Sequence, residues 1–367
     1  MDNNGAHPTS PADGPTRSPS SRMSRIVIPV VVGLVALATG GFLVSQLLEE
    51  VEEPAAEVAV SATRPAASQV VATIPVGRAP QGVAVDEGAA LAYVVTRDVG
   101  GIEEELDAGT VSVVDLNSRE VVDRITVGVD PVGIAVDPPT ASVFVANQYF
   151  GNVSVIDMGT REVVEIIPVG PGARHVVIDT VQGLAYVSSV EDTSVSVIDT
   201  RTRQVVDVMG VGPRPQGMAL ERPGGVLFVT NSEAGTVEAV DPTVRQSSFD
   251  AQERPFGAAV DAEGGAVYVT NWGAKTVTVA EVRTRRWWDT IGVGERPFGV
   301  AVDPGARSVY VTNWGSNNVS VIDANTRQVI AVVPVGLNPT FVDVDTSTGL
   351  VYLSNSGDGT LSIIAPT

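Results

Sequence analysis

The feature that most constrains this fold is a phrase of about 42 residues that recurs along most of the chain. The aromatic residue at the centre of each copy of VYVTN marks the repeat, and it falls at Tyr93, Phe144, Tyr186, Phe228, Tyr268, Tyr310 and Tyr352. The spacings are 51, 42, 42, 40, 42 and 42 residues, the first being longer because extra residues interrupt that copy near 98–106. Self-similarity at such a period in β-rich units predicts a propeller.

Each copy contains four strand-like segments. In the copy at 293–333 they read PFGVAV (297–302), SVYVTN (308–313), NVSVID (318–323) and RQVIAVV (327–333). They are rich in Val, Ile and Tyr and are bounded by Gly, Pro, Asn or Asp, as strands are. Four antiparallel strands form one blade, and a blade needs a neighbour on each face. The predicted fold class is therefore all-β: a closed seven-bladed β-propeller of four-stranded antiparallel blades.

The two ends of the repeat region predict how the ring closes. The seventh copy stops at Thr367 without a fourth strand. The missing strand resembles SQVVATIPV (68–76), which matches RQVIAVVPV (327–335) in the sixth copy. We expect the first and last segments to complete one blade together, which covers two strand edges that would otherwise favour aggregation.

Most of the repeated residues have structural explanations. Glycines follow the inter-blade turn, where innermost strands crowd the axis, and the prolines before them restrict φ. An Asp ends the third strand in most copies, where an Asx turn is expected. The glycines are Gly82, Gly133, Gly217, Gly257 and Gly299.

The phrases VYVTNWGSNNVSVID, VYVTNWGAKTVTVAE and LFVTNSEAGTVEAVD resemble the YVTN family of β-propeller repeats. The resemblance covers residues 68–367 in seven copies. It implies a seven-bladed propeller and no single function. Relatives include surface-layer and cell-envelope proteins, binding scaffolds and, more distantly, lactonase-like enzymes.

Three segments precede the repeats. Residues 1–25 form a Pro- and Ser-rich tail that predicts disorder, and residues 49–67 form an acidic Ala/Glu/Pro linker. Residues 26–48 contain no charge, and a 23-residue helix is long enough to cross a bilayer. We expect a single transmembrane helix, acting as an uncleaved signal anchor.

Charges beside this segment predict its orientation. Arg22 and Arg25 precede it, and four glutamates follow it, so the positive-inside rule places the tail in the cytoplasm. The propeller is then expected outside the cytoplasm, attached to the cell membrane by one span. A cleaved signal peptide, and hence a secreted propeller, is the alternative.

The net charge limits the possible partners. Subtracting +1 for the tail and −4 for the linker from −20 leaves −17 for residues 68–367. Such a domain is not expected to bind nucleic acid through general electrostatics. The absence of cysteine is compatible with any redox compartment.

One sector of the predicted ring differs from the rest. Arginines precede the inter-blade prolines in copies 4, 5 and 6, aromatic residues follow those prolines in copies 5 and 6, and the facing loops carry tryptophans. Guanidiniums bind carboxylate or phosphate, and aromatic faces stack on sugars, rings or cations. We expect a ligand-binding site at the channel mouth, with packing between adjacent turns as the alternative. Its residues are Arg214, Arg254, Phe256, Trp272, Arg296, Phe298 and Trp314.

The third copy breaks the pattern with GPGARHVVID. Arg174 and His175 stand where other copies have Pro-x-Gly, and we include both in the ligand-binding site. One histidine without cysteine cannot form a His-rich metal site. As a general base it needs a partner that the sequence does not show, so a turn or channel-lining role is the alternative. In the seventh copy, Phe341 stands at the position that glycine occupies in most other copies, and it is expected to plug the channel.

Two other features are less specific. The insertion of the first copy carries Asp98, Glu103, Glu104, Glu105 and Asp107, which can ligate Ca²⁺ or form a solvated acidic loop. Trp287 and Trp288 lie in the fourth strand of the fifth copy, so one is expected to face a neighbouring blade and the other water.

These features together favour a binding or interaction scaffold for an envelope protein or a small anionic or carbohydrate ligand. Two alternatives stay open: a lactonase-like hydrolase with a multi-blade site at the mouth, and a purely structural envelope protein. No P-loop, dinucleotide, H-E-x-x-H or G-x-S-x-G motif occurs. We assign no catalytic residue, metal or cofactor and leave the oligomeric state open.

Overall fold

The computed structural model describes residues 68–97, 108–222, 225–240 and 246–366. The predicted tail, membrane span and linker, and the acidic residues of the insertion at 98–107, lie outside these residues. In the described part of the chain no helix is long and apolar enough to cross a membrane.

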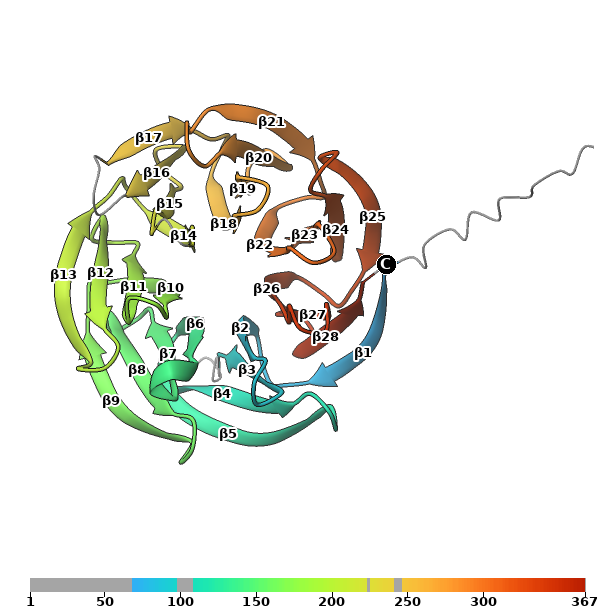
Figure 1. Cartoon of the computed structure of the whole chain (residues 1–367). Helices are drawn as coiled ribbons and strands as arrows, with labels where there is room; N and C mark the ends of the chain where they lie inside the picture. Colours follow the sequence, from blue (N-terminus) through green and yellow to red (C-terminus); the bar gives the residue numbers. More distant parts are fainter. Residues whose placement is uncertain (1–67, 98–107, 223–224, 241–245, 367) are drawn as a thin grey trace, which may run out of the picture. The chain divides into compact units, whose positions relative to one another are not determined.

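The described chain forms seven four-stranded antiparallel sheets arranged around a central axis (Figure 1). Blade 1 has β2 (Pro80–Asp86), β3 (Leu91–Thr96), β4 (Ala108–Asp115) and β5 (Glu120–Val129). Blade 2 has β6 (Pro131–Asp137), β7 (Ser142–Asn147), β8 (Asn152–Asp157) and β9 (Glu162–Pro168). Blade 3 has β10 (Ala173–Asp179), β11 (Leu184–Ser189), β12 (Ser194–Asp199) and β13 (Gln204–Gly210). Blade 4 has β14 (Pro215–Leu220), β15 (Leu227–Asn231), β16 (Thr236–Val240) and β17 (Ser247–Asp250).

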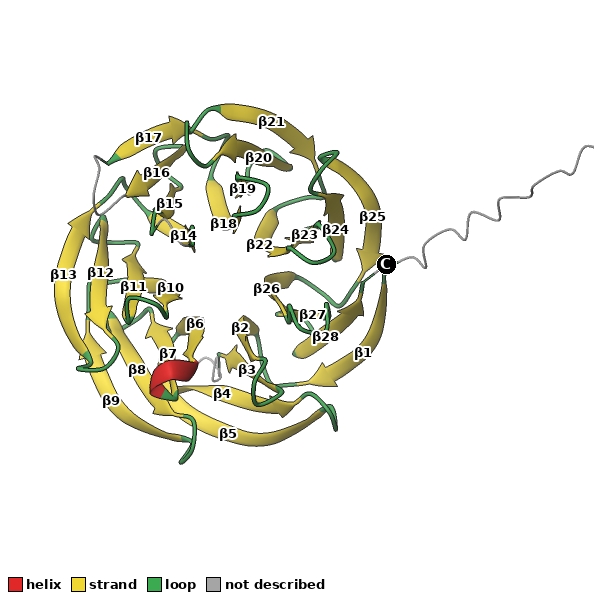
Figure 2. Ribbon diagram, in the orientation of Figure 1, coloured by secondary structure: helices red, strands yellow, loops and turns green. Residues whose placement is uncertain are grey.

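The remaining blades follow the same order from axis to rim. Blade 5 has β18 (Pro255–Asp261), β19 (Ala266–Asn271), β20 (Thr276–Glu281) and β21 (Trp287–Gly292). Blade 6 has β22 (Pro297–Asp303), β23 (Ser308–Asn313), β24 (Asn318–Asp323) and β25 (Gln328–Pro334). Blade 7 has β26 (Pro339–Val344), β27 (Val351–Asn355), β28 (Thr360–Ala365) and β1 (Gln69–Pro75). The described helical structure is one 3₁₀ turn, η1 (Pro138–Thr140), drawn red in Figure 2.

The ring closes as predicted. The first strand of the domain, β1, pairs antiparallel with the last strand, β28, from Gln69 opposite Ala365 to Pro75 opposite Thr360. These segments lie side by side in Figure 1 although they come from opposite ends of the domain. The prediction of a seven-bladed all-β propeller with this closure is confirmed.

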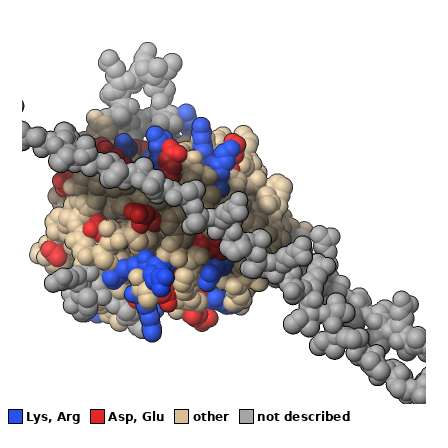
Figure 3. Space-filling model, turned by 90° about the horizontal axis from the view of Figure 1, so that it is seen from above, with Lys and Arg blue, Asp and Glu red and all other residues tan. Residues whose placement is uncertain are grey.

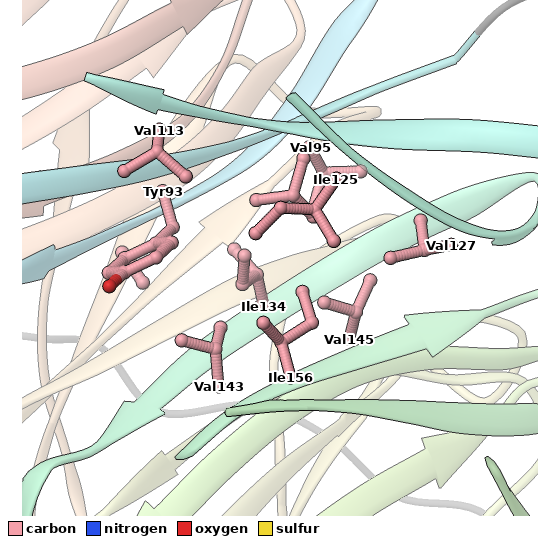
Figure 4. Close-up of a cluster of buried hydrophobic side chains, with 11 residues drawn as sticks. Tyr93, Val95, Val113, Ile125, Val127, Ile134, Val143, Val145 and Ile156 are labelled. Carbon is pink, nitrogen blue, oxygen red and sulfur yellow. The ribbon is translucent and has the colours of Figure 1, made fainter. Parts of the chain in front are cut away.

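The core lies between blades, because each sheet buries both faces against its neighbours. In Figure 4, Tyr93, Val95 and Ile125 from blade 1 face Ile134 and Val145 from blade 2. Trp288 of blade 5 also packs against the neighbouring blade, because the guanidinium of Arg327 in blade 6 lies 4.4 Å from the centre of its ring. Trp287, by contrast, is 46% exposed. The expected division between one inward and one exposed tryptophan is confirmed.

The Thr and Asn of the repeated phrase hold the sheets in register. Thr230 donates a 2.7 Å hydrogen bond to the carbonyl of Phe256 in the next blade, and Thr270 donates one of 2.8 Å to Phe298. Asn313 instead stays within its blade and donates to the side chains of Asn318 and Ser320. The threonine therefore links neighbouring blades, and the asparagine links two strands of one blade.

The repeated glycine is required by the close approach of the innermost strands. A Cβ at Gly217 would lie 2.4 Å from the carbonyl oxygen of Phe256, and one at Gly257 would lie 2.4 Å from that of Phe298. Both distances are shorter than side chains tolerate, so neither position accepts another residue without a backbone shift.

Tyr93→Phe is expected to leave the propeller as stable as before, or to stabilise it by up to about 1 kcal/mol. Tyr93 is fully buried, and its hydroxyl has no hydrogen-bond partner among the described residues. Phe144 and Phe228 occupy the equivalent position in blades 2 and 4. Thermal unfolding of the two proteins checks this, with Tyr93→Ala as the control that loses about 3–5 kcal/mol. A clear destabilisation by Tyr93→Phe would show that the hydroxyl has a partner.

Candidate functional site

Three repeated positions of every blade meet at one face of the propeller, which we call the mouth. They are the residue before the inter-blade turn's proline, the residue after it, and the residue following the second strand; in blade 3 the proline is replaced by Ala173. The backbone N–H of Trp272 donates to the carbonyl of Arg254 (3.0 Å), and that of Trp314 donates to Arg296 (3.1 Å). This bond places each tryptophan beside the arginine of its own blade.

The arginines before the prolines have an unusual backbone. Arg214, Arg254 and Arg296 have φ values of 53°, 53° and 51°, in the left-handed region that residues other than glycine seldom adopt. In each case a backbone N–H that follows the second strand of the same blade donates to the arginine carbonyl and ties the turn to that strand. All three side chains are exposed at the mouth.

A cavity of about 550 Å³ opens at this face, and we call it the mouth pocket. Six of the nine residues predicted from the sequence line it, together with three polar residues from blade 4. Its lining is Arg174, Arg214, Gln216, Ser232, Glu233, Arg254, Phe256, Trp272 and Phe298. The structure therefore brings together side chains from four consecutive blades, 3 to 6. Their role as ligand-binding residues stays a prediction.

The other three predicted residues lie next to this pocket or below it. Arg296 is not in its lining; its guanidinium lies 5.8 Å from the ring centre of Trp272 and 5.2 Å from that of Trp314. This is the packing arrangement considered as the alternative, so Arg296 positions the two tryptophans. His175 lies deeper, in a second cavity of about 490 Å³ along the axis, which we call the channel cavity.

Four residues line both cavities: Arg174, Gln216, Phe256 and Phe298. The ring centres of Phe256 and Phe298 lie 4.2 Å apart. Below them, Phe341 of blade 7 stacks on His175 of blade 3 at 5.7 Å, and its edge meets Phe298 at 5.2 Å. The expectation that Phe341 obstructs the channel agrees with this arrangement.

The mouth pocket has a positive lining in an acidic domain, with three arginines and one glutamate. Arg174 donates to the side-chain oxygen of Gln148 (3.0 Å), and its guanidinium lies 5.1 Å from the ring centre of Phe256. Burial, and then the positive charge of Arg97, lowers the pKa of Arg174 to about 10, so the side chain stays protonated at neutral pH. Arg214 and Arg254 form no ion pair with any described residue. On the side of the propeller shown in Figure 3, by contrast, the two signs are interspersed.

His175 has no acidic partner among the described residues. Its Nδ1 accepts a 3.3 Å hydrogen bond from the backbone N–H of Met218 in the next blade. Burial, and then the charge of Arg174, lowers the pKa of His175 to about 4, so the imidazole is neutral at pH 7. No group of three or more acidic, His or Cys side chains in the described chain can hold a metal ion.

Two charged residues of this region were missed from the sequence. Arg97 occupies the position of Trp272 in blade 1 and pairs with Asp130 at 2.7 Å. Asp343 lines the channel cavity at a position where the other blades carry alanine or valine. Alignment of the seven copies by strand register shows both substitutions, which comparison of the VYVTN phrases alone does not.

Asp343 predicts how stability depends on pH. Its carboxylate accepts hydrogen bonds from the N–H groups of Val85 in blade 1 and of Val344, both at 2.9 Å. Burial is the largest effect and raises the pKa of this carboxyl from 3.8 to about 6. The buried charge, which is present above pH 6, thus destabilises the folded state, and the fold gains stability as the pH falls from about 6 towards 4.

Asp343→Asn removes the buried charge but also one of the two acceptor oxygens, so its expected net effect is to stabilise the propeller by about 1–2 kcal/mol at pH 7.5. The gain should shrink as the pH falls from about 6 to 4 and reverse near pH 3, where the wild-type carboxyl is protonated in both states and the variant still lacks one acceptor. Thermal unfolding of both proteins across this range measures it. A difference independent of pH would mean that the carboxylate is not the cause.

Comparison with known proteins agrees on the fold. No family model matches this chain, and no curated protein matches it. Among solved structures, Kuenenia stuttgartiensis hydrazine synthase superposes with a TM-score of 0.70 at 19% sequence identity, covering 79% of this chain and 96% of that chain. At this identity the likeness shows the fold alone. The protein is a seven-bladed β-propeller, and its membership of the YVTN family stays a prediction.

Proposed function

We propose that this propeller is a binding module whose mouth pocket takes a negatively charged group of its ligand or partner. The observation that carries this proposal is the lining itself. Arg174, Arg214 and Arg254 face one cavity together with Trp272 and Phe256. Guanidiniums bind carboxylate or phosphate through short charge-assisted hydrogen bonds, often two at a time. The ligand is an envelope protein or a small anionic or carbohydrate molecule.

The position of β1 supports presentation of this face to a partner. Pro75, at the end of β1, pairs with Thr360, which directly follows the mouth-side loop of blade 7. Gln69, at the start of β1, pairs with Ala365 at the opposite end of the sheet. A chain that enters at Gln69 therefore joins the propeller on the face away from the mouth. If residues 26–48 anchor the protein in the cell membrane, a tether at that face leaves the mouth accessible.

The alternatives receive less support. A hydrolase at the mouth requires carboxylates within hydrogen-bonding reach of His175. The hydrogen bond that the structure shows for this imidazole is instead one that it accepts from a backbone N–H. A purely structural envelope protein predicts no well-formed pocket at this face, whereas the mouth pocket has a volume of about 550 Å³.

Titration of the full chain with inorganic phosphate, glucuronate and acetyl-aspartate-amide tests the proposal. Trp272 lines the pocket, and the ring of Trp314 lies against that of Trp272. Binding of an anion in the pocket should therefore change the tryptophan fluorescence. We expect a saturable change with at least one of these anions and none with glucose. Equal responses to glucose and to the anions, or no response to any of them, would contradict the proposal.

A further inference from the structure

An exposed pair of aromatic side chains lies in the mouth-side loop of blade 2, and the next blade contributes Arg174 to the mouth pocket. Tyr149 and Phe150 are 56% and 62% exposed, in the loop between β7 and β8. Their rings meet edge to face with centres 4.9 Å apart. Exposed apolar side chains that adjoin one another can mark a protein-interaction site, and Tyr, Trp and Arg are the residues that contribute most at protein interfaces.

The pair is joined to the pocket by a hydrogen bond. Tyr149 directly follows Gln148, whose side-chain oxygen accepts the 3.0 Å bond from Arg174. Gln148 also occupies in blade 2 the position that Trp272 occupies in blade 5. We call the aromatic pair, Gln148 and Arg174 the strip: the chain joins the exposed rings to Gln148, and a hydrogen bond joins Gln148 to Arg174 of the mouth pocket.

This strip is more extended than a small anion requires. A phosphate or a single sugar acid within the mouth pocket would leave Tyr149 and Phe150 in water, since neither residue lines that pocket. An extended peptide places successive side chains about 3.3 Å apart along its axis, so it can contact both regions. The number of negative charges on such a peptide is limited, because Glu233 also lines the pocket and residues 68–367 carry a net charge of −17. Both features disfavour a polyanion.

We infer that the mouth face binds a peptide segment of a protein partner in which one carboxylate is flanked by aromatic or apolar residues. The carboxylate enters the mouth pocket beside Arg174, Arg214 and Arg254. The flanking residues contact Tyr149 and Phe150. This inference rests on the proposed function and specifies the kind of partner.

Calorimetric titration of the full chain with three blocked tripeptides tests it: Phe-Asp-Phe, Ala-Asp-Ala and Phe-Asn-Phe. The variant is Tyr149→Ser with Phe150→Ser, whose exposed positions should leave the melting temperature unchanged. The matched control is Val181→Ser. Val181 is an 84% exposed apolar residue in the turn between β10 and β11 of blade 3, at the end of that blade away from the mouth.

We expect Phe-Asp-Phe to bind at least about tenfold more tightly than either other peptide, an advantage of about 1.4 kcal/mol. The advantage over Ala-Asp-Ala should disappear in the double variant and persist in the control.

The outcomes separate the two claims. Equal binding of Phe-Asp-Phe and Ala-Asp-Ala, unaffected by the double variant, overturns the peptide inference and leaves the anion pocket standing. Equal binding of the Asp and Asn peptides, or no binding of either Asp peptide, overturns the peptide inference. If phosphate, glucuronate and acetyl-aspartate-amide also give no response, the proposed function fails as well.

Discussion

A chain that begins at Arg78, and therefore lacks β1, is expected to lose the cooperative unfolding transition of the propeller. The strand contributes Ile74 to the core and leads into Val76, and both side chains are buried against blades 7 and 1. Burial of each side chain of this size is worth about 1.5–3 kcal/mol. The total stability of a domain is only about 5–15 kcal/mol. Removal of this strand is therefore expected to abolish a large share of the free energy of unfolding.

The same truncation also exposes a strand edge. Without β1, the backbone of β28 is unpaired on one side, and Leu361 and Ile363, buried in the complete ring, lose their cover. Such an edge templates association between chains. We therefore expect aggregation on expression, or a broad non-cooperative melt by calorimetry. The matched control begins at Ser68, keeps β1, and should melt in one sharp transition. A chain beginning at Arg78 that melts as sharply as the control would contradict the role assigned to the closure.

The fold was predictable because the repeat period, the strand length and the closure are all carried by short-range patterns. The residues RQVIAVVPV and SQVVATIPV share their alternation, and a missing fourth strand at one end implies a spare strand at the other. What the pattern did not show is why the phrase is TN rather than another polar pair. The reason lies in contacts that only the folded structure shows: Thr270 donates to the carbonyl of Phe298 in the next blade, and Asn271 links β19 to β20.

The site was predictable in part. The arginines and aromatic residues of copies 4 to 6 differ from the other copies at positions that meet at one face, and six of the nine predicted residues line the mouth pocket. The sequence could not distinguish Arg254, which faces the pocket, from Arg296, which stacks on Trp272 and Trp314. The two arginines follow identical local patterns, and their difference comes from the rings of the neighbouring blade. Asp343 was missed for a similar reason, since only the register of β26 against β27 shows which side chain enters the channel.

Replacement of Arg214 and Arg254 together is expected to weaken anion binding by at least about 100-fold. Hydrogen bonds to charged groups contribute about 1.5–3 kcal/mol each, and 1.4 kcal/mol corresponds to a factor of ten in affinity. Both side chains are exposed, and neither forms an ion pair with a described residue, so their loss should leave the fold intact. Arg296→Ala should have a smaller effect, because it acts through the position of Trp272 rather than on the ligand.

A control is needed for general electrostatics, because each substitution makes an acidic domain more acidic. Arg201 is exposed in the turn between β12 and β13, on the face opposite the mouth. Arg201→Ala removes the same charge from the same domain without touching the pocket. Its affinity for the anion should stay within about twofold of the wild type, since a distant exposed charge is screened by salt.

The central claim is that the mouth pocket binds an anionic group through its arginines. The most direct measurement is the dissociation constant of the full chain for the best-binding anion among phosphate, glucuronate and acetyl-aspartate-amide, determined by calorimetry for four proteins. These are the wild type, Arg214→Ala, Arg214→Ala with Arg254→Ala, and Arg201→Ala. We predict stepwise weakening over the first three and wild-type affinity for the fourth. Equal affinity of the double variant and the wild type, or equal weakening by Arg201→Ala, would contradict the account.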